Sequence, residues 1–253
     1  MKIRKHGRSI RIIFLGQCIA AGYGIDDVNA YPKLVCRLLA AQFPGLSFQP
    51  DFRPLLHPVG LKALLRSCLS SAPDIIFISL PAIFASVPFR LNSLYLAAPD
   101  VMNLARSFVR KIEASVRKDS ALARAFRKRS AFVPTVVCAP VSPDEYERLV
   151  EDAVRFCQQT SACRVVLMGP GGFNVDTGNE ELKSPEMCSV INQAILRVGG
   201  RLDVPVINAH DWMTDQGGKV FSPGNHRWNQ LGHEIMAREI QAVIGAEVRG
   251  PGA

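Results

Sequence analysis

Cys18 and His226 are the two residues whose types and places in the sequence point most directly to chemistry. Cys18 follows the apolar run of residues 10–15, and a thiolate at the end of a strand is a strong nucleophile. His226 stands in a predicted loop before the last helix, and imidazole is the usual base for a Ser or Cys nucleophile. Together they indicate nucleophilic catalysis with a general base, whereas spacing alone favours a small buried Cys18 that closes a turn.

Three residues near His226 extend this hypothesis. Asp211 and Asp215 follow a predicted strand at residues 204–210, and a carboxylate in that place can orient an imidazole. His233 lies in the same segment, "NHRWNQLGHEIMA", as a second candidate base or as a residue of the substrate site. The sequence leaves open which histidine is the base and which aspartate, if either, orients it.

Strands and helices alternate along the chain, which predicts the framework that positions these residues. Strands are predicted at 10–15, 46–50, 73–81, 163–170 and 204–210, and helices at 31–43, 59–71, 142–160, 184–200 and 228–245. This order predicts a three-layer α/β/α fold around a mostly parallel sheet, whose ligands bind at the carboxyl ends of the strands. If a helix began directly after Cys18, its N-terminus would also lower the pKa of the thiol.

Composition narrows the class of protein. With 253 residues and 48 % hydrophobic content, we expect one globular domain over residues 1–253. No apolar run reaches the ~18–20 residues of a membrane helix, and Arg11 interrupts the run that a secretion signal would need. The cysteines lack zinc-site spacing, so we expect neither metal nor cofactor. We interpret Cys36, Cys68, Cys138, Cys157 and Cys188 as buried free thiols, which favours a reducing, cytoplasmic location.

Residues 85–132 interrupt the alternation and are predicted to form a basic helical insertion. The net charge of the chain is +8, and much of the excess falls in this segment. Its cationic faces are either simply solvated or a docking surface for an anionic partner, such as an acidic acyl carrier protein or a phosphate-bearing substrate. No nucleic-acid-binding motif accompanies the charge, so we do not expect nucleic acid as the partner.

Three stretches resemble the SGNH (GDSL-type) hydrolases: "IIFLGQCIAAGYG" with the later "YP", "PDIIFISLP", and "NHRWNQLGHEIMA". The resemblance implies the flavodoxin-like SGNH fold and an acyl hydrolase or acyltransferase without cofactor. It also implies that Cys18 replaces the family's serine as nucleophile and first oxyanion donor, with His226 as base. Gly60 would be the second donor and Gln17, at the family's Asp position, an added one. Ala82 stands in the substrate site where the family has Asn.

These departures leave alternatives open. A thiolate needs less help from a base than a hydroxyl does, which favours thioester chemistry or acyl transfer over ordinary ester hydrolysis. A catalytically inactive protein of the same fold, which binds a ligand or a partner, would also lack the family's serine at position 18 and its asparagine at position 82. A third hypothesis is a phosphate or nucleotide binder that uses "MGPGGFN" (168–174). That stretch lacks the P-loop lysine and the GxGxxG spacing, so it is more typical of a turn.

Overall fold

A five-stranded parallel sheet forms the centre of the protein. The computed structural model describes residues 8–17, 19–22, 25–55, 57–81, 89–92, 135–138, 140–171, 185–222 and 227–249. The sheet contains β1 (Ser9–Gly16), β2 (Ser47–Pro54), β3 (Ile75–Ser79), β6 (Arg164–Met168) and β7 (Val206–Ile207). Their order is β2-β1-β3-β6-β7, and every neighbouring pair is parallel. The parallel sheet predicted from the sequence is confirmed.

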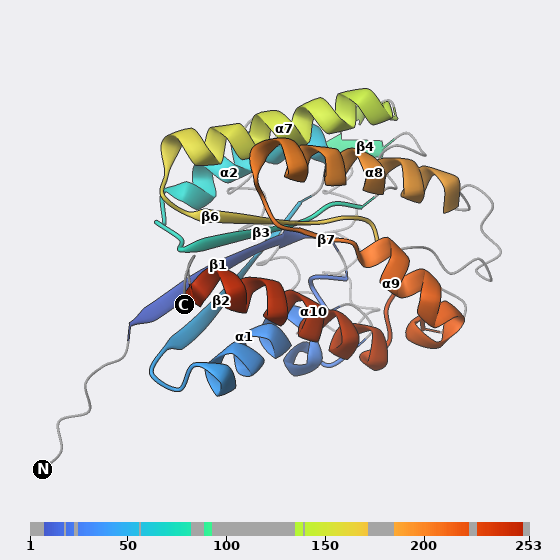
Figure 1. Ribbon diagram of the computed structural model, residues 1–253. Coiled ribbons are helices and arrows are strands. Elements are labelled where there is room, and N and C mark those ends of the chain that lie inside the picture. Colours follow the sequence, from blue (N-terminus) through green and yellow to red (C-terminus); the bar gives the residue numbers. More distant parts are fainter. Residues whose placement is uncertain are drawn as a thin grey trace, which may run out of the picture.

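Helices cover both faces of this sheet (Figure 1). One face carries α2 (Leu61–Leu69), α7 (Pro143–Thr160) and α8 (Pro185–Leu202). The other carries α1 (Tyr31–Gln42), α9 (Ala209–Gln216) and α10 (Gln230–Arg249). The short 3-10 helices η1 (Asp27–Asn29), η2 (Pro58–Gly60) and η5 (Gly217–Val220) connect them. Within the described residues, no helix combines the length and apolarity needed to span a membrane.

Strand β1 shows why a continuous apolar run forms the centre of the sheet. Its side chains alternate between the two faces. Ile12 and Phe14 pack on the side of α1 and α10, whereas Ile13 and Leu15 pack on the side of α2, α7 and α8. All four are 0 % exposed. Burial on both faces requires apolar residues at every position, and each such side chain contributes roughly 1.5–3 kcal/mol.

Helix α7 begins where the sequence predicts it. The Ser142 hydroxyl accepts a hydrogen bond from the Glu145 N–H at 3.2 Å, Pro143 occupies the first turn, and Asp144 adds negative charge there. Arg197 and Arg201 of α8 form ion pairs with Glu147 of α7 at 2.5 and 2.7 Å. The hydrogen bond from Arg197 lowers the pKa of the Glu147 carboxyl. These contacts hold the two helices side by side.

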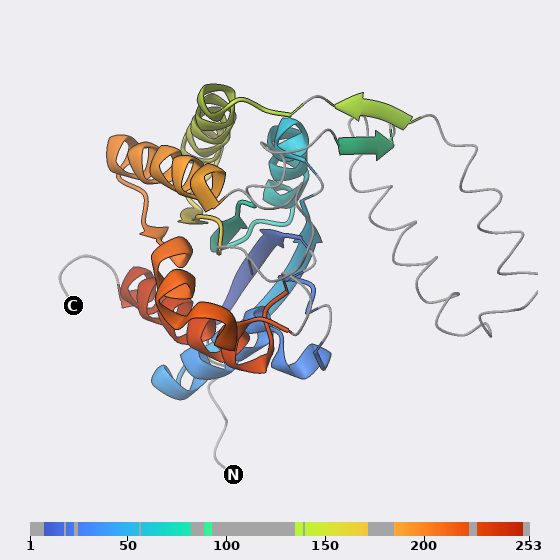
Figure 2. The same cartoon turned by 90° about the vertical axis from the view of Figure 1, so that its right-hand side faces the viewer.

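The structure adds elements that the sequence did not predict. β4 (Phe89–Asn92) and β5 (Thr135–Cys138) form an antiparallel ribbon separate from the main sheet (Figure 2). Residues 85–88 and 93–132 of the predicted insertion lie outside the described residues, so its helices and its docking role stay predictions. Helix α9 follows directly after the two-residue strand β7, where the prediction had a strand to residue 210.

Two neighbouring glycines of α8 give a test of the packing. A Cβ at Gly199 would collide with Val206 and lie 2.8 Å from the Val204 carbonyl oxygen, whereas a Cβ at Gly200 meets nothing within 4 Å. We expect Gly199→Ala to lower the free energy of unfolding by about 1–3 kcal/mol through overpacking. Gly200→Ala is the matched control and should raise it by up to about 1 kcal/mol through helix propensity. Urea unfolding measures both, and equal effects of the two variants would contradict the α8–β7 packing.

Candidate active site

The carboxyl ends of the parallel strands share one edge of the sheet, and that edge is the expected place of a ligand. Gln17 lies there, half-buried, immediately after β1. Cys18, Ala82 and His226 lie outside the described residues, so the structure does not test their roles. It does place the remaining predicted residues, which are Gln17, Gly60, Asp211, Asp215 and His233.

Among the described residues that follow β1, 19–22 form a turn, and the first helix is the short η1. The Gln17 carbonyl accepts from the Ala21 N–H at 3.0 Å, and the Ile19 carbonyl accepts from the Gly22 N–H at 3.0 Å. Gly22 then adopts φ +71°, a left-handed conformation that ends the turn. Helix α1 starts only at Tyr31. The condition under which a helix N-terminus would lower the pKa of Cys18 is therefore not met by the described residues.

Gly60 is buried at the end of η2, and its N–H already has a partner. It donates to the His57 carbonyl oxygen at 3.1 Å within the 3-10 turn. The His57 Nδ1 in turn accepts from the Val59 N–H at 3.3 Å, and burial lowers the pKa of His57. The second oxyanion donor expected from the sequence is thus engaged inside η2 in this conformation.

Asp211 and Asp215 occupy successive turns of α9, and both are exposed. Asp211 lies closer to the carboxyl edge, because α9 begins two residues after β7 ends. Its Oδ2 accepts from the Asn208 amide at 2.6 Å, while Asn208 Oδ1 accepts from the buried Asn192 amide at 2.9 Å. This chain of amides fixes the direction of the Asp211 carboxylate, and sequence reasoning did not anticipate it.

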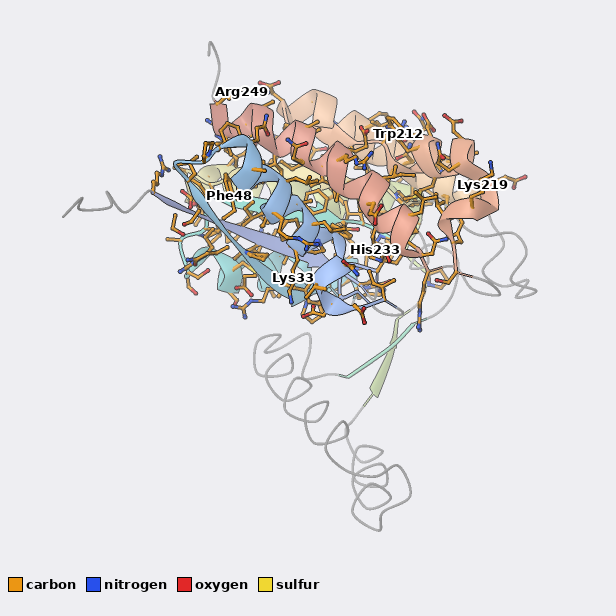
Figure 3. The ribbon with its side chains drawn as sticks, turned by 90° about the horizontal axis from the view of Figure 1, so that it is seen from below. Lys33, Phe48, Trp212, Lys219, His233 and Arg249 are labelled. Atoms are coloured by element: carbon orange, nitrogen blue, oxygen red, sulfur yellow. The ribbon has the colours of Figure 1, made fainter. Side chains whose placement is uncertain are left out.

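His233 lies inside the core, although the sequence suggested a candidate base or a substrate-contacting residue. Its side chain is 0 % exposed, and its Nδ1 accepts from the Tyr31 N–H at 3.2 Å. Figure 3 shows it where α10 meets α1. Burial lowers the pKa of His233 to about 4, so the ring is neutral near pH 7 and carries its proton on Nε2. We therefore assign His233 to the framework that positions the site.

The described residues on each side of His226 form a narrow hairpin. Phe221 and Trp228 pair as an antiparallel bridge, and the Ser222 N–H donates to the Arg227 carbonyl at 2.8 Å. The Trp228 indole packs against Gly171, where a Cβ would collide with it. Because Gly171 follows β6, the hairpin lies over the carboxyl edge of the sheet.

Tyr31 joins this hairpin to the end of β1. Its ring lies 5.9 Å from that of Trp228, and its hydroxyl lies 3.7 Å from the point where a Cβ of Gly16 would be. Its ring also stacks on His233 at 6.0 Å. The sequence predicts that a helix begins at residue 31, but it does not predict that the Tyr31 side chain joins these two segments.

The buried His233 predicts an acid-sensitive fold. Between about pH 6.5 and pH 4 the unfolded imidazole binds a proton that the folded one does not, so stability falls as the pH drops through this window. The loss is roughly 2 kcal/mol by pH 5. His233→Asn retains an acceptor for the Tyr31 N–H but cannot titrate, so its stability should fall less between about pH 7 and pH 5. Urea unfolding measures the two slopes, with His210→Asn as control, and identical slopes would refute the assignment.

Comparison with known proteins bears on the fold. No family model matches the sequence, and no curated protein sequence matches it. The lipase/acylhydrolase from Enterococcus faecalis is 18 % identical, with a TM-score of 0.61 over 93 % of this chain and 95 % of that chain. The acetylxylan esterase Axe2 from Geobacillus stearothermophilus, solved as a catalytic mutant, is 15 % identical, with a TM-score of 0.59 over 97 % of each chain. TesA is 11 % identical, with a TM-score of 0.57 over 92 % of this chain and 97 % of that chain. The protein therefore has the three-layer α/β fold shared by these structures, as the sequence motifs predicted.

Proposed function

We propose that the protein is an acyl hydrolase or acyltransferase that acts on an ester or thioester. The Cys18 sulfur attacks the acyl carbon while His226 accepts the thiol proton, and the leaving alcohol or thiol takes that proton as its bond to the acyl group breaks. Water or a second acceptor then cleaves the thioester that links the acyl group to Cys18. This proposal needs neither a metal nor a cofactor.

The observation that carries the proposal is the meeting of two distant chain segments at Tyr31. Gly16 precedes Cys18 by two residues and packs near the Tyr31 hydroxyl, while Trp228 follows His226 by two residues and packs on the Tyr31 ring. Both segments lie at the carboxyl edge, where parallel α/β sheets bind ligands. The shared fold with a lipase/acylhydrolase and an esterase supports the same reaction class.

The thiol suits a site with few oxyanion donors. Loss of one donor typically costs ~10²–10³ in rate, and here Gly60 is engaged with His57 while position 82 is an alanine without an amide side chain. We assign the remaining donors to the Cys18 N–H and the Gln17 amide. Thioesters react readily with a thiolate, so we propose an acyl thioester as the donor.

A non-catalytic role on the same fold is the alternative, and the Gly60 contact favours it. A hydrogen bond from Gly60 to the His57 carbonyl occupies a donor that catalysis would need. In that case the carboxyl edge would bind a small molecule or a partner without cleaving it.

Our proposal of an acyl-transfer enzyme also includes an acidic acyl carrier protein as the partner of residues 85–132 and a cytoplasmic location. Both rest on the sequence alone.

Variants of Cys18 and His226 test the reaction. We expect Cys18→Ala to abolish turnover of an acyl thioester, and His226→Ala to slow iodoacetamide alkylation of Cys18 at neutral pH by roughly tenfold or more. The tryptic peptide 12–33 contains Cys18 as its only cysteine, so mass spectrometry reads both alkylation and a trapped acyl group there. Cys163→Ala, at the opposite edge of the sheet, is the matched control. If Cys18 is alkylated slowly and at the same rate with and without His226, and if no acyl group is found on the peptide, the non-catalytic binding role is favoured.

The two aspartates can be separated in the same assay. Because Asn208 holds the Asp211 carboxylate at the carboxyl edge, we expect Asp211→Asn to lower kcat by up to ~10⁴-fold. Asp215→Asn should lose less, since Asp215 lies one turn farther from β7. The pH–rate profile of each variant shows whether the loss arises at the base, and the larger loss in Asp215→Asn would reverse the assignment.

A further inference from the structure

Two cysteines at the edge of the sheet opposite the candidate active site form a second pair of side chains with the chemistry to react. Cys157 lies in the last turn of α7, and Cys163 immediately precedes β6. Figure 1 shows the connection between α7 and β6 at the end of the sheet remote from α9. This pair is therefore independent of the candidate active site.

The turn between α7 and β6 folds the two residues onto each other. The Ser161 N–H donates to the Cys157 carbonyl at 3.0 Å, and the Cys163 N–H donates to the Ser161 hydroxyl oxygen at 3.1 Å. The chain thus reverses within a few residues and brings the two thiols within hydrogen-bonding reach. Cys68 of α2 lies near Cys157 on the inner side.

The two thiols differ in their access to solvent. Cys157 is 0 % exposed, whereas Cys163 is half-buried. Cys163 lines two hollows of about 780 Å³ and about 700 Å³, together with Arg164 and Glu247. A small oxidant can therefore reach Cys163 directly, while Cys157 is shielded behind it.

The surroundings of Cys163 also favour its thiolate. Hydrogen bonds from Cys157, from Ser161 and from its own backbone N–H lower the pKa of Cys163 to about 7, although partial burial opposes them. The interaction with Cys163 and burial raise the pKa of Cys157. The Cys163 sulfur is thus the nucleophile, and Cys157 stays protonated beside it until the second step.

We propose that Cys163 and Cys157 are a peroxide-sensitive thiol pair that forms a reversible intramolecular disulfide. The Cys163 thiolate attacks one oxygen of a hydroperoxide, so that an S–O bond forms, the O–O bond breaks and an alkoxide or hydroxide leaves. Cys157 then attacks the Cys163 sulfur, the S–S bond forms, and the S–O bond breaks with release of hydroxide, which takes up the Cys157 proton as water. The two sulfurs supply the two electrons that reduce the peroxide.

The sequence makes this proposal simple to test. Trypsin cleavage after Arg155 and Arg164 yields one peptide, residues 156–164, that contains both cysteines. We expect hydrogen peroxide to convert this peptide in the reduced, full-length protein to a form lighter by two hydrogens, which iodoacetamide no longer labels and dithiothreitol restores. Conversion should be at least about tenfold faster than oxidation of the buried Cys36 and Cys188 in the same sample.

Two variants assign the roles. In Cys157→Ser the reaction should stop at a sulfenic acid on Cys163, which dimedone traps, and in Cys163→Ser the shielded Cys157 should stay reduced. The wild-type measurement does not depend on how well either variant folds. The proposal is overturned if the wild-type peptide oxidises no faster than Cys36 and Cys188, if Cys163 stays a sulfenic acid beside an intact Cys157, or if Cys157 pairs with Cys68 instead.

Discussion

The hydrogen bond between the Tyr31 N–H and His233 Nδ1 is the contact on which the carboxyl edge depends. Tyr31 is the first residue of α1, and Ala30 before it has no side chain able to cap the helix. An imidazole from α10, 202 positions later in the chain, supplies the missing acceptor. The N-terminal turns of α1 and α10, which cover the same face of the sheet, are thereby joined, and a protonated imidazole could not accept this hydrogen bond.

The rest of the edge is built outward from that bond. It holds the Tyr31 ring among Phe14, Phe77, Trp228 and His233, with ring separations near 6 Å. Packing in such a cluster is close to that of an organic crystal, so neighbouring backbone has little freedom to shift. The turn after β1 and the hairpin before α10 rest on the same aromatic surface. The proposed reaction needs this rigidity, because a nucleophile and a base from distant segments must hold a fixed distance.

Much of the framework was predictable, because its signals are local. Strands buried on both faces read as unbroken apolar runs, and Ser142 marks the start of α7 by its capping chemistry. The burial of His233 could also have been predicted from the sequence, because its spacing from three apolar residues places all four on one face of a helix. These residues are Met236, Ala237 and Ile240, and the structure buries them with His233. The Gly60 hydrogen bond and the Asn208–Asp211 contact were not predictable, because each depends on the exact backbone of a short turn. The roles of Cys18 and His226 stay predictions.

The β4–β5 ribbon has a consequence for how the protein can vary over evolution. Asn92 pairs with Thr135, so the chain leaves the described structure and returns to it at neighbouring positions. A segment attached in this way is modular: it can lengthen, shorten or change its charge while its two attachment points stay paired. The ribbon would tolerate replacement of residues 93–134 by a tight hairpin turn. The chain between β4 and β5 could thus change in evolution while the five-stranded sheet stays the same.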